Sequence, residues 1–212
     1  MSITHHPAPE SLMSCSAGSM PEAFAAVMAS HMAMCPSCRK ELAAMERIGT
    51  VLFEAIAPTA VACEAQVTSM RDLGLRDERQ PRSDGDVPAP LARALGTSLD
   101  RVPWTWAGRG VWQHQISLSH ECSSSLRLIK VAAGLSLPKH SHSGSELTLV
   151  LRGSFRDESG QYAAGDVADV SDEIEHAPIA DAEQGCICLV ATEGKLRFKS
   201  RIARFIQPLT GF

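Results

Sequence analysis

The first third of the chain repeats its apolar residues at helical spacing. From residue 24 onward the positions follow one another in steps of three and four, which places them on one helix face: Phe24, Val27, Met28, His31, Met32 and Cys35. Pro21 fits the first turn of this helix, with Ser19 as its cap. After an interruption at residues 36–37, a second helical pattern covers 38–53 and ends before Pro58, and a third covers 61–73.

Beyond residue 100 the pattern changes to short runs typical of β-strands. They cover residues 125–131, 146–151, 165–170, 186–191 and 196–200, and glycine-containing breaks separate many of them. Residues 76–90 are polar and rich in Pro and Gly, which is typical of a linker. We therefore predict a helical domain over 1–75, a linker over 76–100, and a β-barrel or sandwich over 101–212. All three tryptophans lie within residues 104–112, and we expect them to pack against the barrel.

Composition narrows the class of protein. The chain has 44% hydrophobic and 21% charged residues and no apolar run near the roughly 20 residues that span a bilayer. Its N-terminus lacks a basic start followed by an apolar stretch, so we expect a cytoplasmic protein with no membrane association. Residues 1–90 carry 11 acidic and 7 basic side chains, whereas 91–212 carry 13 of each. This balance disfavours direct nucleic-acid binding and suits contact with a basic protein surface.

A first candidate metal site lies in the helical domain. His31 and Cys35 are one helical turn apart, and Cys38 follows just past a proline. Three such donors suit tetrahedral Zn²⁺, with His5, His6 or Cys15 as the fourth ligand. The alternatives are a buried histidine beside two inert thiols, or a Cys-x-x-Cys redox pair. We favour zinc, because a helical module of about 75 residues has a thin core that a structural metal would stabilise.

A second candidate site lies in the β-half. His140 and His142 are two residues apart and point to one side of an extended strand, and Glu146 shares their parity. His176 on a later strand would complete a set of three imidazoles and one carboxylate. Zn²⁺ is the ion we expect there, while Mn²⁺, Fe²⁺ and Ni²⁺ also suit such ligands. A metal-free barrel with solvated histidines is the alternative.

The spacing of this second group matches the motifs of the cupin barrels. The first motif runs Gly134-x5-His140-x-His142-x3-Glu146-x6-Gly153, and Gly165 with His176 fits the second. Its Pro-x-Gly turn falls at residues 171–173 and its final Asn at Ala180, so these two features depart from the pattern. The resemblance implies an all-β cupin fold, a double-stranded β-helix.

Further polar and thiol residues carry weaker signals. Cys186 and Cys188 share one strand face, as candidate redox thiols near the barrel metal or, our preferred interpretation, as small buried side chains. We interpret residues 156–158 as a polar hairpin without further role. His114 and His120 match no motif.

Taken together, the chain resembles the ChrR family of zinc-binding anti-sigma factors. The resemblance rests on the His31-x3-Cys35-x2-Cys38 signature with His5-His6 upstream, on the cupin motifs, and on residues 186–189. The family spacing favours His6 as the fourth N-terminal ligand. The resemblance implies a cytoplasmic regulator whose N-terminal domain holds an extracytoplasmic-function sigma factor away from RNA polymerase. It also implies zinc in both domains and a cupin that responds to singlet oxygen or related oxidants.

A cupin metalloenzyme, similar to a dioxygenase and with the helices as a docking arm, is the competing hypothesis. An open metal position would permit such chemistry. Apart from the ligands, Tyr162, Glu173 and Glu175 are the residues one would consider as acid or base. We assign no catalytic residue and expect a non-enzymatic protein, because a cupin enzyme has no need of the N-terminal module.

Overall fold

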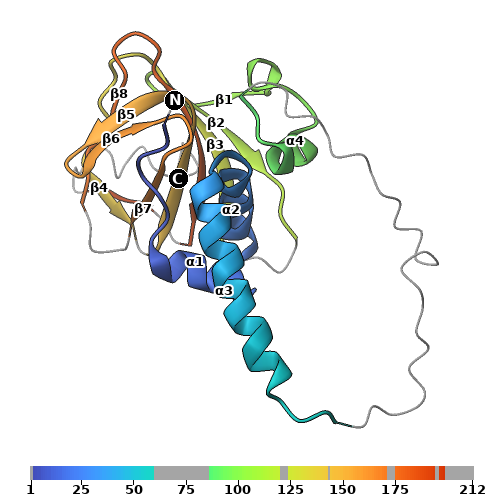
Figure 1. The fold of residues 1–212 in the computed structure, drawn as a ribbon. Helices are drawn as coiled ribbons and strands as arrows, with labels where there is room; N and C mark the ends of the chain where they lie inside the picture. Colours follow the sequence, from blue (N-terminus) through green and yellow to red (C-terminus); the bar gives the residue numbers. More distant parts are fainter. Residues whose placement is uncertain are drawn as a thin grey trace.

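A helical layer precedes and covers a β-barrel (Figure 1). The structure is a computed structural model that describes residues 2–59, 86–119, 124–142, 144–170, 175–193 and 196–198, without the side chains of 142 and 196–198. The predicted helix over 61–73, the first part of the linker, His120 and Glu173 lie outside these residues. The helices are α1 (Pro9–Ser16), α2 (Glu22–Met34), α3 (Pro36–Glu54), α4 (Ala89–Leu95) and the short 3-10 helix η1 (Leu99–Arg101). Among the described residues, no helix combines the length and the apolar character that crossing a membrane requires.

The helix boundaries differ from the predicted ones at two prolines. Pro21 is the N-cap of α2 rather than a residue of its first turn, and Ser19 donates its hydroxyl to the Ser14 carbonyl instead of capping the helix. Pro36 starts α3 rather than interrupting the pattern, since its fixed φ and missing N–H suit a first helical position. The corner between α2 and α3 is the single extended residue Cys35, with φ −108° and ψ 103°.

The barrel is built from antiparallel strands. Its larger sheet has the order β1-β2-β3-β9-β5-β6, with β7 and β8 also paired to β5, and a second small sheet joins β10 to β4. The strands are β1 (Thr105–Gly108), β2 (Val111–Ile116), β3 (Ser125–Val131), β4 (His140–His142), β5 (Glu146–Asp157), β6 (Gly160–Ala163), β7 (Val167–Val170), β8 (Ile179–Ala180), β9 (Cys186–Thr192) and β10 (Leu196–Phe198). The expected runs at 125–131 and 186–191 are confirmed. The strands β1, β2 and β6 were not predicted.

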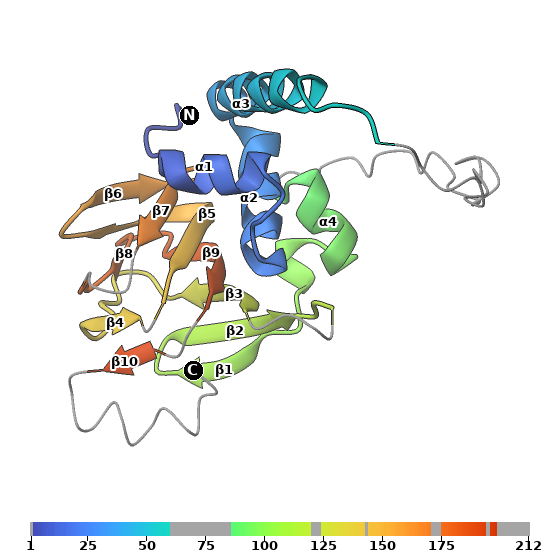
Figure 2. The same cartoon turned by 90° about the horizontal axis from the view of Figure 1, so that it is seen from below.

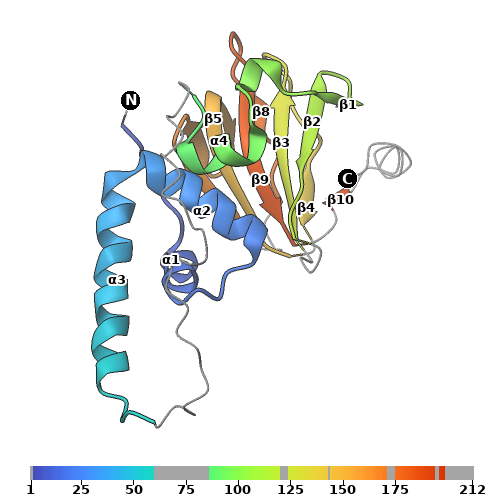
Figure 3. The same ribbon diagram turned by 90° about the vertical axis from the view of Figure 1, so that its right-hand side faces the viewer.

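Helices and barrel share one hydrophobic core. The outward-facing side chains of β3, β5 and β9, including the fully buried Leu128, Leu149 and Leu189, cluster with Val27 and Met28 of α2. Figures 2 and 3 show the helices stacked on one face of the sheet, with α3 on the side of that layer away from the strands. The predicted all-α part followed by an all-β cupin barrel is confirmed, but the two parts fold against each other.

The second half of the expected linker is part of that core. Residues 86–100 include α4 and η1, and Val87, Leu91 and Leu99 are all buried. The Arg152 guanidinium of β5 also binds the carboxylates of Asp86 and Asp100, both at 2.6 Å. Residues 86–100 therefore differ from the predicted linker, because their large apolar side chains pack into the core and hold α4 and η1 against it.

The barrel interior is lined by the alternate residues of the same strands. Val150, Cys186, Cys188 and Val190 face inward with Phe155 and Tyr162, while Ile187 and Leu189 face the helices. The predicted shared face of Cys186 and Cys188 is confirmed. Gly153, the last position of the first cupin motif, has φ +72°, and a Cβ there would lie 2.0 Å from the Gly185 carbonyl oxygen. Glycine is required at this crossing of β5 and β9.

Candidate metal centres

Four side chains from four segments converge where α2 meets α3. His31 comes from the last turn of α2, Cys35 from the corner, and Cys38 from the first turn of α3. His6 comes from the extended segment 2–8, which we call the N-terminal strap. One donor atom from each lies within 4.8 Å of all the others. The structure thus selects His6 among the three candidates for the fourth donor, while His5 points to the barrel instead.

The spacing of the donors fits a tetrahedral ion. The Cys38 Sγ lies 3.3 Å from His31 Nε2 and 3.2 Å from His6 Nδ1, and Cys35 Sγ lies 3.5 Å from His6 Nδ1. Ligand bonds of about 2.3 Å to sulfur and about 2.0–2.1 Å to nitrogen imply donor separations of about 3.6 Å in a tetrahedron. His31, Cys35 and Cys38 are also nearly inaccessible to solvent. Two thiols and two imidazoles this close, of which only His6 is exposed to solvent, fit Zn²⁺ in a structural site.

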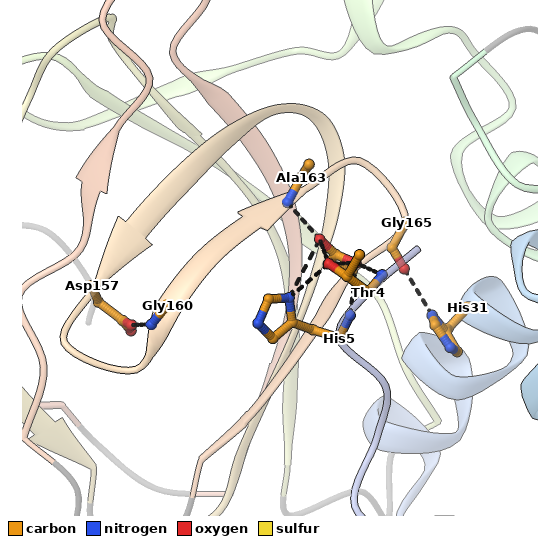
Figure 4. Close-up of polar contacts among 8 residues, drawn as sticks. Thr4, His5, His31, Asp157, Gly160, Ala163 and Gly165 are labelled. Atoms are coloured by element: carbon orange, nitrogen blue, oxygen red, sulfur yellow. Dashed lines mark hydrogen bonds and ion pairs between the residues drawn. The ribbon is translucent and has the colours of Figure 1, made fainter. Parts of the chain in front are cut away.

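The His31 ring is oriented by a carbonyl of the barrel. Its Nδ1–H donates to the Gly165 carbonyl oxygen at 2.9 Å (Figure 4). This leaves Nε2 as the nitrogen that faces Cys38. Burial lowers the pKa of His31, although the Gly165 carbonyl opposes the shift. The imidazole is therefore neutral at neutral pH, which is the form that binds a metal.

The two thiols are unequal. Burial and the Cys35 side chain raise the pKa of Cys38 to about 12. For Cys35 burial also raises the pKa, but hydrogen bonds from Ser37 and Cys38 outweigh it and lower the pKa below the ordinary thiol value. A divalent cation would stabilise the thiolate form of both Cys35 and Cys38. The pair is therefore better suited to binding a metal together than to acting as two separate thiols.

The second group of predicted ligands lies at one end of the barrel interior. His140 of β4 and His176 exchange backbone hydrogen bonds of 3.1 Å, and their ring centroids are 4.6 Å apart. Glu146 opens β5, is buried, and accepts a 3.0 Å hydrogen bond from the Thr148 hydroxyl. His142 belongs to the backbone of β4, and its side chain lies outside the described part.

Both described imidazoles of the barrel group are held through Nδ1. His140 Nδ1–H donates to the Pro138 carbonyl at 2.8 Å, and His176 Nδ1–H donates to Asp157 Oδ2 at 3.1 Å. Each ring thus presents Nε2 as its acceptor nitrogen, as in metal sites with a fixed outer sphere. Burial lowers the pKa of His140 to about 4 and raises the pKa of Glu146, the latter partly opposed by the nearby His176.

Asp157 has a role in the barrel group that the sequence did not indicate. The sequence predicts only a polar hairpin here, yet the Asp157 side chain is only 3% exposed and accepts a hydrogen bond from His176. Its other oxygen accepts N–H bonds from Ser159 and Gly160, so it also caps the turn between β5 and β6. The only signal was its place between an apolar strand and a Ser-Gly turn, which any hairpin would share.

The interior thiols lie next to this group. Their mutual hydrogen bond and burial raise the pKa of Cys188 well above the ordinary thiol value, and the charge of Glu146 adds to the shift. A protonated Cys188 fits a buried small side chain, the interpretation we preferred.

The N-terminal donors form a compact set. Among the described side chains, these four each place a donor atom within 4.8 Å of the others. The barrel group brings His140, Glu146 and His176 to one region of the interior, and the side chain of its fourth predicted ligand, His142, is not among those described.

Comparison with known proteins agrees with both halves of this arrangement. Residues 93–195 match the family described as the ChrR cupin-like domain. The chain is 38% identical over 211 residues to the anti-sigma-E factor ChrR of Cereibacter sphaeroides, covering 98% of each chain. The chain belongs to the ChrR family of anti-sigma factors. A solved structure of Rhodobacter sphaeroides SigE in complex with the anti-sigma ChrR matches with a TM-score of 0.75 at 38% identity, over 90% of this chain and 100% of that one.

Solved cupin structures of lower identity match about half of the chain. An acetylacetone dioxygenase from Acinetobacter johnsonii is 15% identical, with a TM-score of 0.43 over 54% of this chain and 91% of that one. Similarity at this level is no evidence that the present chain has the activity of these cupins.

Proposed function

We propose that this chain is a cytoplasmic, non-enzymatic regulator that captures an extracytoplasmic-function sigma factor through its N-terminal helices. The observation that carries the proposal is the 38% identity to ChrR over 98% of both chains, since it spans the helical half as well as the barrel. The ChrR of the matched structure was solved in complex with SigE.

An apolar stripe on α3 that no other described residue covers supports a helical docking surface. Leu42 and Met45 pack against the shared core near the start of the helix. The stripe continues beyond the core with side chains that are 63–76% exposed: Ile48, Val51, Leu52 and Phe53, followed by Ile56 just past the helix. Figure 1 shows this half of α3 extending away from the barrel. Contiguous exposed apolar residues of this kind are typical of a protein interface.

The two metal groups would have different tasks in this proposal. Zn²⁺ held by His6, His31, Cys35 and Cys38 would supply a redox-inert crosslink between the strap and the α2–α3 corner. In the barrel, His140, His142, Glu146 and His176 would hold a second ion, for which we propose Zn²⁺. Singlet oxygen or a related oxidant would act at this end of the barrel and favour a state with lower affinity for the sigma factor.

The docking surface is tested in the full chain, because truncation near residue 85 would remove the barrel face on which α2 packs. Val51→Lys with Leu52→Lys keeps helix propensity and places positive charge on the stripe. We expect at least a tenfold loss of repression in a reporter driven by the cognate sigma factor, as for centrally buried interface residues. The matched control is Trp106→Lys on β1, another 65% exposed apolar residue, which should repress normally.

Repression that survives the double substitution would show that α3 is not part of the interface.

The proposed response to oxidant is tested separately. A His176→Ala chain should still repress but should no longer release the reporter under illumination with a singlet-oxygen photosensitiser. A normal response in this variant would contradict sensing at the barrel group.

A further inference from the structure

A single carboxylate of the barrel fastens the N-terminal strap. The Asp166 side chain is 2% exposed and lies in the turn between β6 and β7. Its Oδ1 accepts the backbone N–H groups of Thr4 at 2.7 Å and His5 at 2.9 Å, and its Oδ2 accepts that of Ala163 at 2.8 Å (Figure 4). The N–H of Val167 returns a bond to the His5 carbonyl at 3.1 Å. The backbone of the strap is therefore hydrogen-bonded directly to this turn of the barrel.

A second barrel carboxylate fastens the far side of His6. Asp169 Oδ2 accepts the backbone N–H of Ala8 at 3.0 Å and the hydroxyl of Ser11 at 2.6 Å. Ala8 is the N-cap of α1 and has no side-chain acceptor, and Asp169 fastens this helix start by binding the Ala8 N–H and the Ser11 hydroxyl of the first turn. His6 lies between these two anchors, one at residues 4–5 and one at residues 8–11.

The same turn also reaches the helix ligand. Gly165, directly before Asp166, gives its carbonyl to His31 Nδ1 at 2.9 Å. Its φ is +97°, and a Cβ there would lie 2.7 Å from the Ile3 side chain of the strap. Both imidazoles of the N-terminal centre are thus positioned by one stretch of barrel, residues 165–169.

The strap also touches the hairpin that serves the other centre. The His5 ring lies 4.4 Å from the Tyr162 ring, centroid to centroid, and Tyr162 stacks on Phe155 at 4.9 Å. This β5–β6 hairpin is closed by Asp157, the carboxylate that holds His176. The residue next to His6 therefore rests on the element that orients a barrel ligand.

We propose that residues 165–169 of the barrel form the outer sphere of the N-terminal metal centre, so that tight metal retention by the helices depends on the barrel. Asp166 is the main positioning residue, with Gly165 and Asp169 on either side. A disturbance of the barrel that shifts the β6–β7 turn would loosen His6 and His31 together. This proposal rests on the proposed function only for its regulatory consequence.

The test uses the full chain loaded with Co²⁺. Thiolate-to-cobalt charge-transfer absorption reports the thiolate centre, and its loss in Cys38→Ser assigns the band. In Asp166→Ala we expect metal affinity at this centre, measured by chelator competition, to fall about tenfold, as for other outer-sphere changes. The matched control is Asp181→Ala, which removes a carboxylate that caps its own barrel turn through Glu183 and Gln184. It should stay within about twofold of wild type.

A milder variant keeps the test decisive if Asp166→Ala folds poorly. Ser11→Ala removes only the 2.6 Å bond to Asp169 and should lower cobalt affinity two- to threefold with an unchanged circular dichroism spectrum. Wild-type affinity in both variants would overturn the proposal. Capture of the sigma factor by the metal-loaded wild-type chain is measured in parallel. Its failure would count against the proposed function, whereas the cobalt affinities alone decide the outer sphere.

Discussion

The two candidate centres of this molecule are assembled in opposite ways. The N-terminal centre joins donors 32 positions apart at most, yet barrel residues more than 130 positions away hold its imidazoles in place. The barrel centre draws its ligands from β4, β5 and the segment at residue 176, and its outer partners Pro138 and Asp157 belong to the same barrel. One centre therefore spans the two halves of the protein, whereas the other is internal to one half.

The chemistry of the donors follows the same division. Two buried thiols and two imidazoles form a closed set that suits a structural Zn²⁺. Imidazoles with a buried carboxylate suit a wider range of ions and leave room for a further ligand. The N-terminal donor set therefore suits a structural role and the barrel donor set suits ligand exchange, while the N-terminal strap and the shared core connect the two groups.

The largest effect should come from removing the N-terminal metal. His31→Ala deletes a buried ligand, and structural zinc contributes on the order of 10 kcal/mol of apparent binding free energy to folding. We expect zinc content to fall by one ion per chain and the helical signal to melt several degrees or more below wild type. His114→Ala, a histidine outside both centres, is the control. Unchanged zinc content in His31→Ala would remove the N-terminal site.

The next effect concerns the shared core. Leu189 is fully buried between barrel and helices, and Leu→Ala at such positions costs about 3 kcal/mol. Because helices and sheet share this core, we expect helical circular dichroism and the fluorescence of the barrel tryptophans to shift to the same lower temperature. The exposed Ile48→Ala should change neither by more than about 0.5 kcal/mol. Two separate transitions would show that the halves fold independently.

A smaller effect is expected at the outer sphere of the barrel centre. Asp157→Asn keeps the shape of the side chain but weakens its hold on His176 Nδ1–H. We expect metal affinity at the barrel to fall about tenfold, equivalent to about 1.4 kcal/mol, while the thiolate centre keeps its metal. Asp181→Asn serves as the control, and isothermal titration with Zn²⁺ measures both. If both variants bind Zn²⁺ at the barrel with equal affinity, Asp157 has only a structural role.

The smallest effect on stability should accompany the α3 substitutions. Val51 and Leu52 are each 66% exposed, so Val51→Lys with Leu52→Lys should change the free energy of unfolding by less than about 0.5 kcal/mol. Chemical denaturation measures this directly. Destabilisation by more than about 1 kcal/mol would mean that the stripe already packs against another part of the chain.

Local chemistry was predictable from the sequence, and contacts across the chain were not. The His31, Cys35 and Cys38 spacing and the alternation at residues 186–190 depend on helix and strand periods, so both were found. The role of Asp166 depends on a strap 160 residues away, and nothing in its local pattern indicates it. Residues 86–100 looked like a linker because Val87, Leu91 and Leu99 are widely spaced among polar residues and prolines, yet each fills a place in the core.

We propose that the metal-bound helices, and not the barrel centre, capture the sigma factor. The most direct test is calorimetric titration of the full chain, with zinc in excess, against the extracytoplasmic-function sigma factors of its own host. We predict that His31→Ala weakens the tightest of these interactions at least 100-fold, whereas His176→Ala stays within about threefold of wild type. Equal loss in both variants, or capture that survives His31→Ala, would contradict the account.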